Sequence, residues 1–380
     1  MKKIGMITFH ESDNYGTVLQ AYALQHTIKK IGYEAEILNY QRGIIVDSKK
    51  SSFISKIWKT ISLYSGVGIF HFPIIKQCII EKSIKFKEFR EKYLNRSDII
   101  FESLEEIQKY SMEYDAFICG SDMIWSTDRS NEIEVFFLVF APKEKRVAYA
   151  PSFGRQDVDN KYIDIYRDYI NDMRFLSCRE MSGIKLIKNL TEREADFVLD
   201  PTLLINGSEW SKLFSLEIKA NPYVLCYLFE NEYTKVKSVV NTVAKRLGCG
   251  VRIIPMTVDD YMMNNNNKKN GIGPIEFLKL FSEASFVFTN SYHGLLFSFI
   301  FNKSFYVLRR NKFGQWHQFE DRLESILSIL NLKERIISDN TELDNEELEI
   351  EYGVINKKIN QLRKNSVSYL EKALNVASGG

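Results

Sequence analysis

The residues best suited to chemistry lie at positions 289–294, where the sequence reads Thr-Asn-Ser-Tyr-His-Gly. This segment separates an apolar strand-like stretch from an apolar helix-like stretch, so His293 is expected at the amino end of a helix that faces a cleft. An imidazole in that place can give or take a proton near neutral pH. A lone histidine is more often structural, but its neighbours Asn290, Ser291 and Gly294 favour a site. We predict that His293 is catalytic.

A second polar segment, residues 10–17, follows the first apolar run of the chain. Because it joins a strand to a helix, its free backbone amides can bind an anion or a sugar. Asn14, Tyr15 and Gly16 are therefore candidate sugar-binding residues. The alternative is purely local: Asp13 or Asn14 caps the helix, and Gly16 permits a turn.

A third segment, residues 119–125, also follows a strand-like run and contains Ser121, Asp122 and Trp125. A sugar ring can lie on the face of the Trp125 indole, with Ser121 as a further contact. Asp122 can take a proton from a sugar hydroxyl, so we predict that it is catalytic. Asp122 could equally be the N-cap of a helix.

The fourth segment places Arg179 directly after the strand-like residues 175–178. The guanidinium fork suits a carboxylate or a phosphate, so Arg179 is a candidate anion ligand. The alternative is a surface ion pair with the adjacent Glu180. No metal site is predicted, since the spacings H-x-x-H and H-E-x-x-H are absent around the other histidines, His10, His26, His71 and His317.

These four segments need a scaffold that gathers the ends of several strands. Ile4–Phe9, Val18–Ile31 and Glu34–Tyr40 read as strand, helix and strand, the size of a βαβ crossover. Short strands are also expected at Asp115–Cys119, Arg146–Ala150, Phe175–Cys178 and Phe197–Leu199.

A second alternation of strands and helices begins after the polar region 205–221. Its expected strands are Tyr223–Phe229, Val251–Pro255, Phe286–Thr289 and Phe305–Leu308, and its helices are Lys235–Leu247, Pro274–Ala284, Asp321–Leu330 and one beginning near His293. We predict an α/β protein of two Rossmann-like domains that face each other across a cleft. The domains are residues 1–210 and 211–350, and residues 351–380 form a helix able to cross back to the first domain.

Residues 52–95 differ from the rest by mixing aromatic and lysine side chains. Amphipathic helices packed on the domain are the plain interpretation, and a surface that touches anionic lipid is the alternative. The stretch Ile61–Ile80 has the length of a membrane span but contains Gly66, Pro73 and Lys76, so we expect no span.

The composition narrows the class of protein. The 51 Lys and Arg nearly balance the 49 Asp and Glu, so nucleic acid is not an expected partner. The five cysteines are odd in number and lack C-x-x-C spacing, which argues against a disulfide scaffold or a zinc knuckle. The apolar run at the start is too short for a signal peptide, so a cytoplasmic location is expected.

Six motifs occur in order between residue 4 and about residue 308. They are N-Y-G-T-V-L-Q-A-Y-A-L-Q from Asn14, G-S-D with Trp125, A-P-S-F-G from Ala150, S-C-R-E from Ser177, L-D-P-T-L-L from Leu199, and S-Y-H-G with Asn302-Lys303. Together they resemble the polysaccharide pyruvyl transferase family. The resemblance implies a fold similar to GT-B glycosyltransferases and the transfer of pyruvate from phosphoenolpyruvate to a sugar as a ketal.

The resemblance also implies partners and roles. The acceptor would be a sugar or lipid-linked glycan precursor of a surface polysaccharide such as a capsule or exopolysaccharide, with peripheral contact at the inner membrane face. His293 resembles the catalytic histidine and Arg179 a donor-anion ligand. The second domain would be the donor side, and the first domain the acceptor side. The donor-side residues would then include Asn290, Ser291, Gly294 and Lys303.

The chemistry of ketal formation agrees with these residue types. An enol phosphate needs a proton at its methylene carbon, a sugar hydroxyl at the adjacent carbon, and a cradle for the departing phosphate. No metal or redox cofactor is required, and phosphoenolpyruvate is a co-substrate. Two other functions remain open: a GT-B glycosyltransferase that uses a nucleotide sugar, and a non-catalytic sugar-binding component of a polysaccharide assembly complex.

Overall fold

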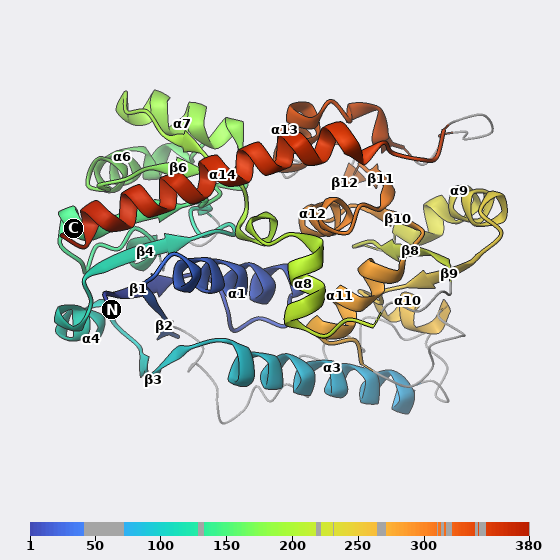
Figure 1. Cartoon of the computed structure of the whole chain (residues 1–380), viewed down its shortest axis with the longest axis horizontal. Helices are drawn as coiled ribbons and strands as arrows, with labels where there is room; N and C mark the ends of the chain where they lie inside the picture. Colours follow the sequence, from blue (N-terminus) through green and yellow to red (C-terminus); the bar gives the residue numbers. More distant parts are fainter. Residues whose placement is uncertain are drawn as a thin grey trace.

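The structure, a computed structural model, is built on two parallel five-stranded sheets (Figure 1). It describes residues 1–41, 72–127, 133–217, 222–230, 232–263, 271–309, 311–312, 315–316, 321–338, 341 and 347–379. The first sheet has the order β3-β2-β1-β4-β5 and the second β14-β11-β10-β8-β9. Every pairing within these two sheets is parallel.

The strands of the first sheet are β1 (Lys3–Ile7), β2 (Glu34–Tyr40), β3 (Arg96–Phe101), β4 (Ala116–Gly120) and β5 (Arg146–Tyr149). Those of the second are β8 (Tyr223–Tyr227), β9 (Gly250–Ile253), β10 (Phe286–Thr289), β11 (Ser304–Leu308) and β14 (Ile336–Ile337). Two short pairs stand apart: β6 (Ser177–Cys178) with β7 (Asp196–Phe197), and β12 (Asn311–Lys312) with β13 (Gln315–Trp316).

The helices of the first half are α1 (Tyr15–Lys30), α3 (Phe72–Tyr93), α4 (Leu104–Tyr110), α5 (Ile133–Phe136), α6 (Ile163–Asn171), α7 (Met181–Thr191) and α8 (Gly207–Leu213), with the 3₁₀ segment η5 (Pro201–Leu204). Those of the second are α9 (Glu232–Arg246), α10 (Val258–Met263), α11 (Pro274–Glu283), α12 (Tyr292–Ile300), α13 (Asp321–Leu330) and α14 (Tyr352–Ala377).

Each sheet reverses its strand order at one point, and loops that follow strands at such a point form a crevice. In the first sheet β2 and β4 lie on opposite sides of β1, so the loops after β1 and β4 meet there. In the second sheet β8 and β10 are neighbours, with β9 beyond β8 and β11 beyond β10. Their loops are tied together, because the Asn290 side chain accepts a hydrogen bond from the Phe229 amide at 2.8 Å. Three of the four loops predicted to carry chemistry therefore lie at these two points.

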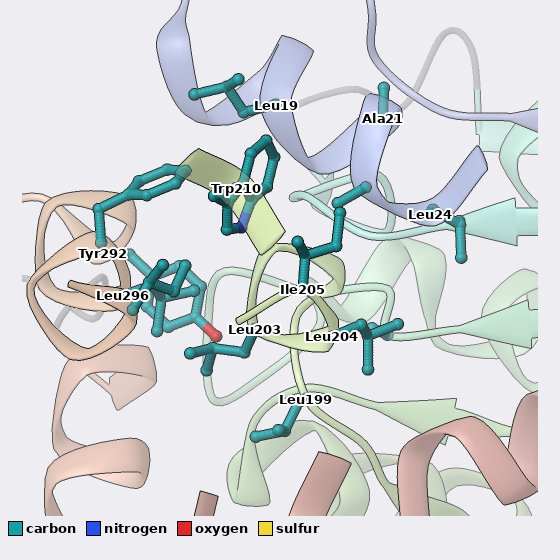
Figure 2. Packing of buried hydrophobic residues seen from close by; sticks show 14 of the residues in the cluster. Leu19, Ala21, Leu24, Leu199, Leu203, Leu204, Ile205, Trp210, Tyr292 and Leu296 are labelled. Carbon is teal, nitrogen blue, oxygen red and sulfur yellow. The ribbon is translucent and has the colours of Figure 1, made fainter. Parts of the chain in front are cut away.

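One continuous apolar cluster joins the sheets. It includes Ile4 and Met6 of β1, Leu225 of β8 and Phe297 of α12. Figure 2 shows its centre, where η5 and Trp210 of α8 lie between α1 and α12. Leu203 and Trp210 are both almost fully buried. The two halves consequently share this cluster, and each half also has a separate apolar cluster of its own, around Phe117 in the first half and around Phe288 in the second.

Two long helices also connect the halves (Figure 1). Helix α3 lies along one side of the molecule, and its Lys85 donates to the carbonyl of Gly271 at 2.8 Å and pairs with Glu276 of α11. A Cβ at Gly271 would overlap the backbone of α3, so the contact needs a glycine there. The predicted lipid-facing region 52–95 is described only from residue 72 onward; residues 52–71 lie outside the described part.

Helix α14 runs across the whole molecule on the opposite side (Figure 1). Near its start the Tyr352 hydroxyl donates to the carbonyl of Lys303 at 2.6 Å in the second half. Further along, Ser366 accepts from the Leu199 amide at 2.9 Å and Tyr369 donates to the Ala148 carbonyl at 2.8 Å in the first half. The last helix therefore holds both halves in a fixed relation.

Candidate functional site

The centre of the candidate site is a buried ion pair between Arg179 and Asp200. The Nη1 of Arg179 donates to Oδ2 of Asp200 at 2.7 Å, and neither side chain is exposed. Ser121, after β4, donates to the same carboxylate at 2.8 Å and accepts from Arg179 at 3.1 Å. The alternative of a surface ion pair with Glu180 is therefore wrong, because the Arg179 side chain is fully buried.

Arg179 is held in place through Nη1, but its other two guanidinium nitrogens make no hydrogen bond with the described residues. Its guanidinium lies 4.7 Å from the centre of the Tyr292 ring, at the start of α12. Its Nε and Nη2 are buried and make no hydrogen bond within the described part of the chain, although Glu180 and Asp122 lie within 3.8 Å and 3.7 Å of these nitrogens. A buried donor without an acceptor is costly, so these two nitrogens are available to a ligand.

Asp122 lies beside this arginine in a left-handed backbone conformation. Its φ is 69°, a value that aspartate and asparagine adopt more readily than other residues except glycine. Its carboxylate accepts from the Thr17 hydroxyl and from the Met123 amide, each at 2.8 Å. Burial alone would raise the pKa of Asp122, but Arg179, His293 and the Thr17 hydrogen bond together hold it below its usual value. No α-helix begins in the residues described directly after Asp122, so it is not a helix cap.

His293 comes from the other half and meets the same carboxylates. It lies in the first turn of α12, with Nε2 at 3.6 Å from Oδ2 of Asp200. That distance is too long for a good hydrogen bond, and Nε2 is buried with no hydrogen-bond partner among the described residues. A Cβ at Gly16 would overlap the His293 ring, so Gly16 is what lets α1 approach it. His293 and Arg179 both help to lower the pKa of Asp200 despite its burial, which by itself raises it.

Glu180 adds a second orphaned carboxylate oxygen to the site. Its Oε1 accepts from the Phe153 amide at 3.0 Å, whereas Oε2 is buried with no hydrogen-bond partner in the described chain. Burial raises the pKa of Glu180, partly offset by Arg179 and Arg322. Oε2 can accept a hydrogen bond from a ligand group that reaches it.

The remaining predicted residues near His293 have structural tasks. Ser291 is the N-cap of α12 and accepts from the Gly294 amide at 3.3 Å. A side chain at Gly294 would overlap Thr289, so this glycine allows α12 to pack on β10. Asn290 is engaged with Phe229, as described above. These contacts position His293, and the role of the three residues in donor binding stays a prediction.

Two predicted sugar-binding aromatics are wrong because both are core residues. Trp125 is fully buried, stacks on Phe137 with ring centres 4.6 Å apart, and donates to the Phe136 carbonyl at 3.1 Å. Tyr15 is 1% exposed, stacks on Phe277 at 4.4 Å, and donates to the Ile272 carbonyl at 2.9 Å. Neither ring face is free to hold a sugar.

Two further predictions need correction. Lys303 precedes β11, at the amino-terminal edge of the sheet, and the rest of α12 puts about 10 Å between it and His293 at ~1.5 Å per residue. It therefore cannot share a donor site with His293. Asn14 is the N-cap of α1 and accepts from the Thr17 amide at 3.3 Å, so the local alternative describes it correctly.

Sequence reasoning missed several members of the site, namely Thr17, Glu180, Asp200, Tyr292 and Arg322. Asp200 carried a signal, since it opens the Asp-Pro-Thr turn after β7 and its Oδ1 accepts from the Thr202 amide at 3.0 Å. Arg322 carried none, because it stands in an ordinary charged helix start. Among the described residues no group of three or more His, Cys, Asp and Glu could hold a metal ion. His71 and His317 lie outside those residues.

None of the described helices is long and apolar enough to cross a lipid bilayer. Comparison with known proteins found no match among curated proteins. UDP-GlcNAc 2-epimerase from Methanocaldococcus jannaschii is similar in structure with a TM-score of 0.50 at 12% identity, over 96% of this chain and 92% of that chain. MurG from Acinetobacter baumannii has a TM-score of 0.48 at 8% identity, over 99% of both chains.

Likeness at so low an identity concerns the fold alone, and it agrees with the two parallel sheets. The prediction of an α/β, GT-B-like fold with two Rossmann-like halves is confirmed. A family model described as polysaccharide pyruvyl transferase matches residues 14–312, a range that contains Thr17, Asp122, Arg179, Asp200 and His293. The chain therefore belongs to the polysaccharide pyruvyl transferase family and is a transferase.

Proposed function

We propose that this enzyme moves pyruvate from phosphoenolpyruvate to two hydroxyls of one sugar in a surface-polysaccharide precursor, as a ketal. One observation carries the proposal: buried polar atoms of Arg179, Glu180 and His293 converge at one crevice without hydrogen-bond partners in the described chain. Buried polar groups without a partner are rare in native structures, and a catalytic role is one explanation for several of them in one place. Family membership supports pyruvyl transfer in general, and these residues supply what the donor and the acceptor need.

On the donor side, Arg179 binds an anionic group of phosphoenolpyruvate through Nε and Nη2. His293 lies beside it with Nε2 free, so it can deliver a proton to the methylene carbon or to the departing phosphate. Asp200 lies 2.7 Å from Nη1 of Arg179 and 3.6 Å from Nε2 of His293. Its negative charge stabilises the positive charge that His293 carries when it holds a proton. We propose that no metal or redox cofactor takes part in these steps.

On the acceptor side, Asp122 is the base. Its lowered pKa keeps it ionised at neutral pH, so it can accept a proton from a sugar hydroxyl. The hydroxyl oxygen bonds to the central carbon of the donor as the methylene carbon gains a proton. The carbon–oxygen bond to phosphate then breaks, and the second hydroxyl closes the ketal and gives its proton to the medium or to phosphate. Atoms balance with inorganic phosphate as the only other product.

The first test is thermal unfolding with candidate donors. A ligand at 100 times its Kd stabilises a protein by about 2.7 kcal/mol, so phosphoenolpyruvate should raise the unfolding temperature of the wild type. Arg179→Lys should lose that shift and keep the fold, because lysine keeps the charge but not the fork. A shift with a UDP or GDP sugar and none with phosphoenolpyruvate would instead indicate a nucleotide-sugar glycosyltransferase.

A second test separates an enzyme from a sugar-binding component. His293→Gln should bind phosphoenolpyruvate and release no phosphate in the presence of acceptor sugars, while the wild type releases one phosphate for each ketal formed. If the variant supports polysaccharide assembly as well as the wild type does, the non-catalytic alternative is correct. Activity with a free sugar would also show that a lipid carrier is not needed.

We further propose that the precursor is lipid-linked and that α3 rests on the cytoplasmic face of the membrane. Ile74, Ile80 and Ile84 are exposed on this helix at 46%, 36% and 50%, next to the exposed Lys87. Exposed apolar side chains beside lysine suit an anionic bilayer surface. Flotation with anionic vesicles should retain the wild type and lose Ile80→Glu/Ile84→Glu. Equal flotation of both proteins, or of neither, would refute the contact.

A further inference from the structure

Arg322, the second residue of α13, forms no ion pair with any residue that the structure describes. Its Nε is shielded from solvent and has no hydrogen-bond partner in the described chain. By contrast, Arg179 pairs with Asp200 at 2.7 Å. The side chain remains partly accessible, so a ligand can reach it.

Arg322 faces the same aromatic ring as Arg179. Their guanidinium carbons lie 5.5 Å and 4.7 Å from the centre of the Tyr292 ring. Burial, and next the charge of Arg179, lower the pKa of Arg322 to about 10, so it stays positive at neutral pH. Two cations are thus held near each other in a sheltered place, an arrangement that an anion between them would stabilise.

The position of Arg322 is fixed by contacts of its own helix with the first half. The adjacent Asp321 accepts from the Ser182 hydroxyl, and from Gln156 at 3.3 Å. One turn later Ser325 accepts from the Met181 amide at 3.4 Å. The first turn of α13 therefore docks on the start of α7, close to the loop that carries Arg179 and Glu180. Arg322 is held at the crevice by this docking and not by a partner of its own.

We propose that Arg322 binds the phosphate group of the donor together with Arg179. This inference rests on the proposed function for the identity of the donor. Arg179 is already paired with Asp200 at 2.7 Å, so part of its charge is neutralised before a ligand arrives. Arg322 has no ion pair of its own among the described residues, so its guanidinium has donors to offer to the ligand. A phosphate brings about two negative charges and three acceptor oxygens, which two guanidinium forks can share, whereas a carboxylate brings one charge.

The test is calorimetric titration with three probes: phosphoenolpyruvate, inorganic phosphate and pyruvate. The proteins are the wild type, Arg322→Gln, Arg322→Lys and the control Arg309→Gln. Arg309 is a matched control because it is half-exposed and contacts Glu324 of the same helix at 3.7 Å. Arg322→Gln should raise the Kd for phosphoenolpyruvate and for phosphate about tenfold or more, and Arg322→Lys should raise both by less. Neither variant should change the Kd for pyruvate much. Arg309→Gln should bind all three probes like the wild type.

Several results would overturn the inference. Unchanged binding of phosphoenolpyruvate and phosphate by Arg322→Gln would do so, and so would a loss confined to pyruvate, since Arg322 would then hold the carboxylate. If Arg322→Gln does not fold, Arg322→Lys with a wild-type unfolding temperature decides the matter by the same comparison. If the wild type binds phosphate but does not bind phosphoenolpyruvate, the proposed donor is wrong. The effect of Arg322→Gln on phosphate binding would then still test whether Arg322 forms part of the phosphate site. Binding of neither by the wild type would overturn both proposals.

Discussion

The buried pair of Arg179 and Asp200 allows the sharpest prediction, which concerns stability and not activity. Asp200→Asn keeps the size of the side chain but removes its charge. Arg179 would then lie fully buried with its nearest carboxylates, Asp122 and Glu180, at 3.7 Å and 3.8 Å instead of 2.7 Å. The guanidinium cannot lose its proton, because an arginine side chain stays protonated in proteins. Most of the desolvation penalty of this cation is therefore left uncompensated.

The magnitude follows from the burial of both partners. Removing one partner of a buried ion pair costs about 3–5 kcal/mol, whereas an exposed pair contributes about 0–1 kcal/mol. At about 2 °C per kcal/mol for a chain of this length, the unfolding temperature should fall by roughly 6–10 °C at pH 7. The double variant Arg179→Met/Asp200→Asn leaves no unpaired charge and should be destabilised by less than the sum of the single variants. The coupling should fall at about 0.5–3 kcal/mol.

The assay is thermal unfolding followed by circular dichroism between pH 3 and pH 8, with Asp164→Asn as the exposed control. Asp164 pairs with Arg167 at 2.6 Å but its side chain is 92% exposed. The folded-state pKa of Asp200 is lowered, so its contribution is fully present above the ordinary aspartate pKa of about 4 and declines as the pH falls below that value. The gap between wild type and Asp200→Asn should be constant from pH 5 to 8 and shrink below pH 4. An equal unfolding temperature at pH 7, or strictly additive single variants, would refute the reasoning.

Two other predictions concern the same crevice. Gly16→Ala should reduce kcat by about tenfold or more, because the new methyl group would push the His293 ring away from Asp200. The control is Gly353→Ala on α14, whose new methyl group meets no other atom and which should keep wild-type turnover. Equal activities of the two variants would contradict the predicted clash. Asp122→Asn should lower kcat by about 10²–10⁴-fold if this residue is the base. Since the pKa of Asp122 is lowered, any acid limb of the wild-type pH–rate profile that belongs to it should fall below pH 4. If the acid limb of the wild-type profile lies above pH 4, or if Asp122→Asn turns over normally, a residue other than Asp122 is the base.

Much of the fold could be predicted because parallel strands are nearly continuous apolar runs. The strands β8, β10 and β11 are buried along most of their length, and their predicted positions agree with the structure to within two residues. Two edge strands were missed for the opposite reason. β3 is mostly polar or exposed, with Ile99 and Ile100 facing solvent, and β14 has only two residues. An edge strand needs no apolar alternation, so the pattern does not reveal it.

The sequence predicted which residue types belong to the site better than it predicted where their side chains point. His293, Asp122 and Arg179 were singled out because each follows a buried strand, β10, β4 and β6, and polar residues after parallel strands line crevices. Trp125 and Tyr15 were wrong because a position after a strand does not say which way an aromatic ring points, and both turn into the core. Asp200 and Arg322 come from elements distant in sequence from those they meet. Only the three-dimensional packing brings Asp200 to Arg179 and His293, and Arg322 to Tyr292.

The apolar cluster shared by both sheets bears on how the molecule unfolds. Proteins with two sheets often melt in two steps, because each half has a core of its own. Here Leu203 and Trp210 lie between α1 and α12 (Figure 2), and α14 is bonded to both halves. The shared cluster therefore loses its packing in both halves together, although each half also has a cluster of its own. We expect a single calorimetric transition with equal calorimetric and van't Hoff enthalpies. Two separate heat-absorption peaks would show that the halves melt independently.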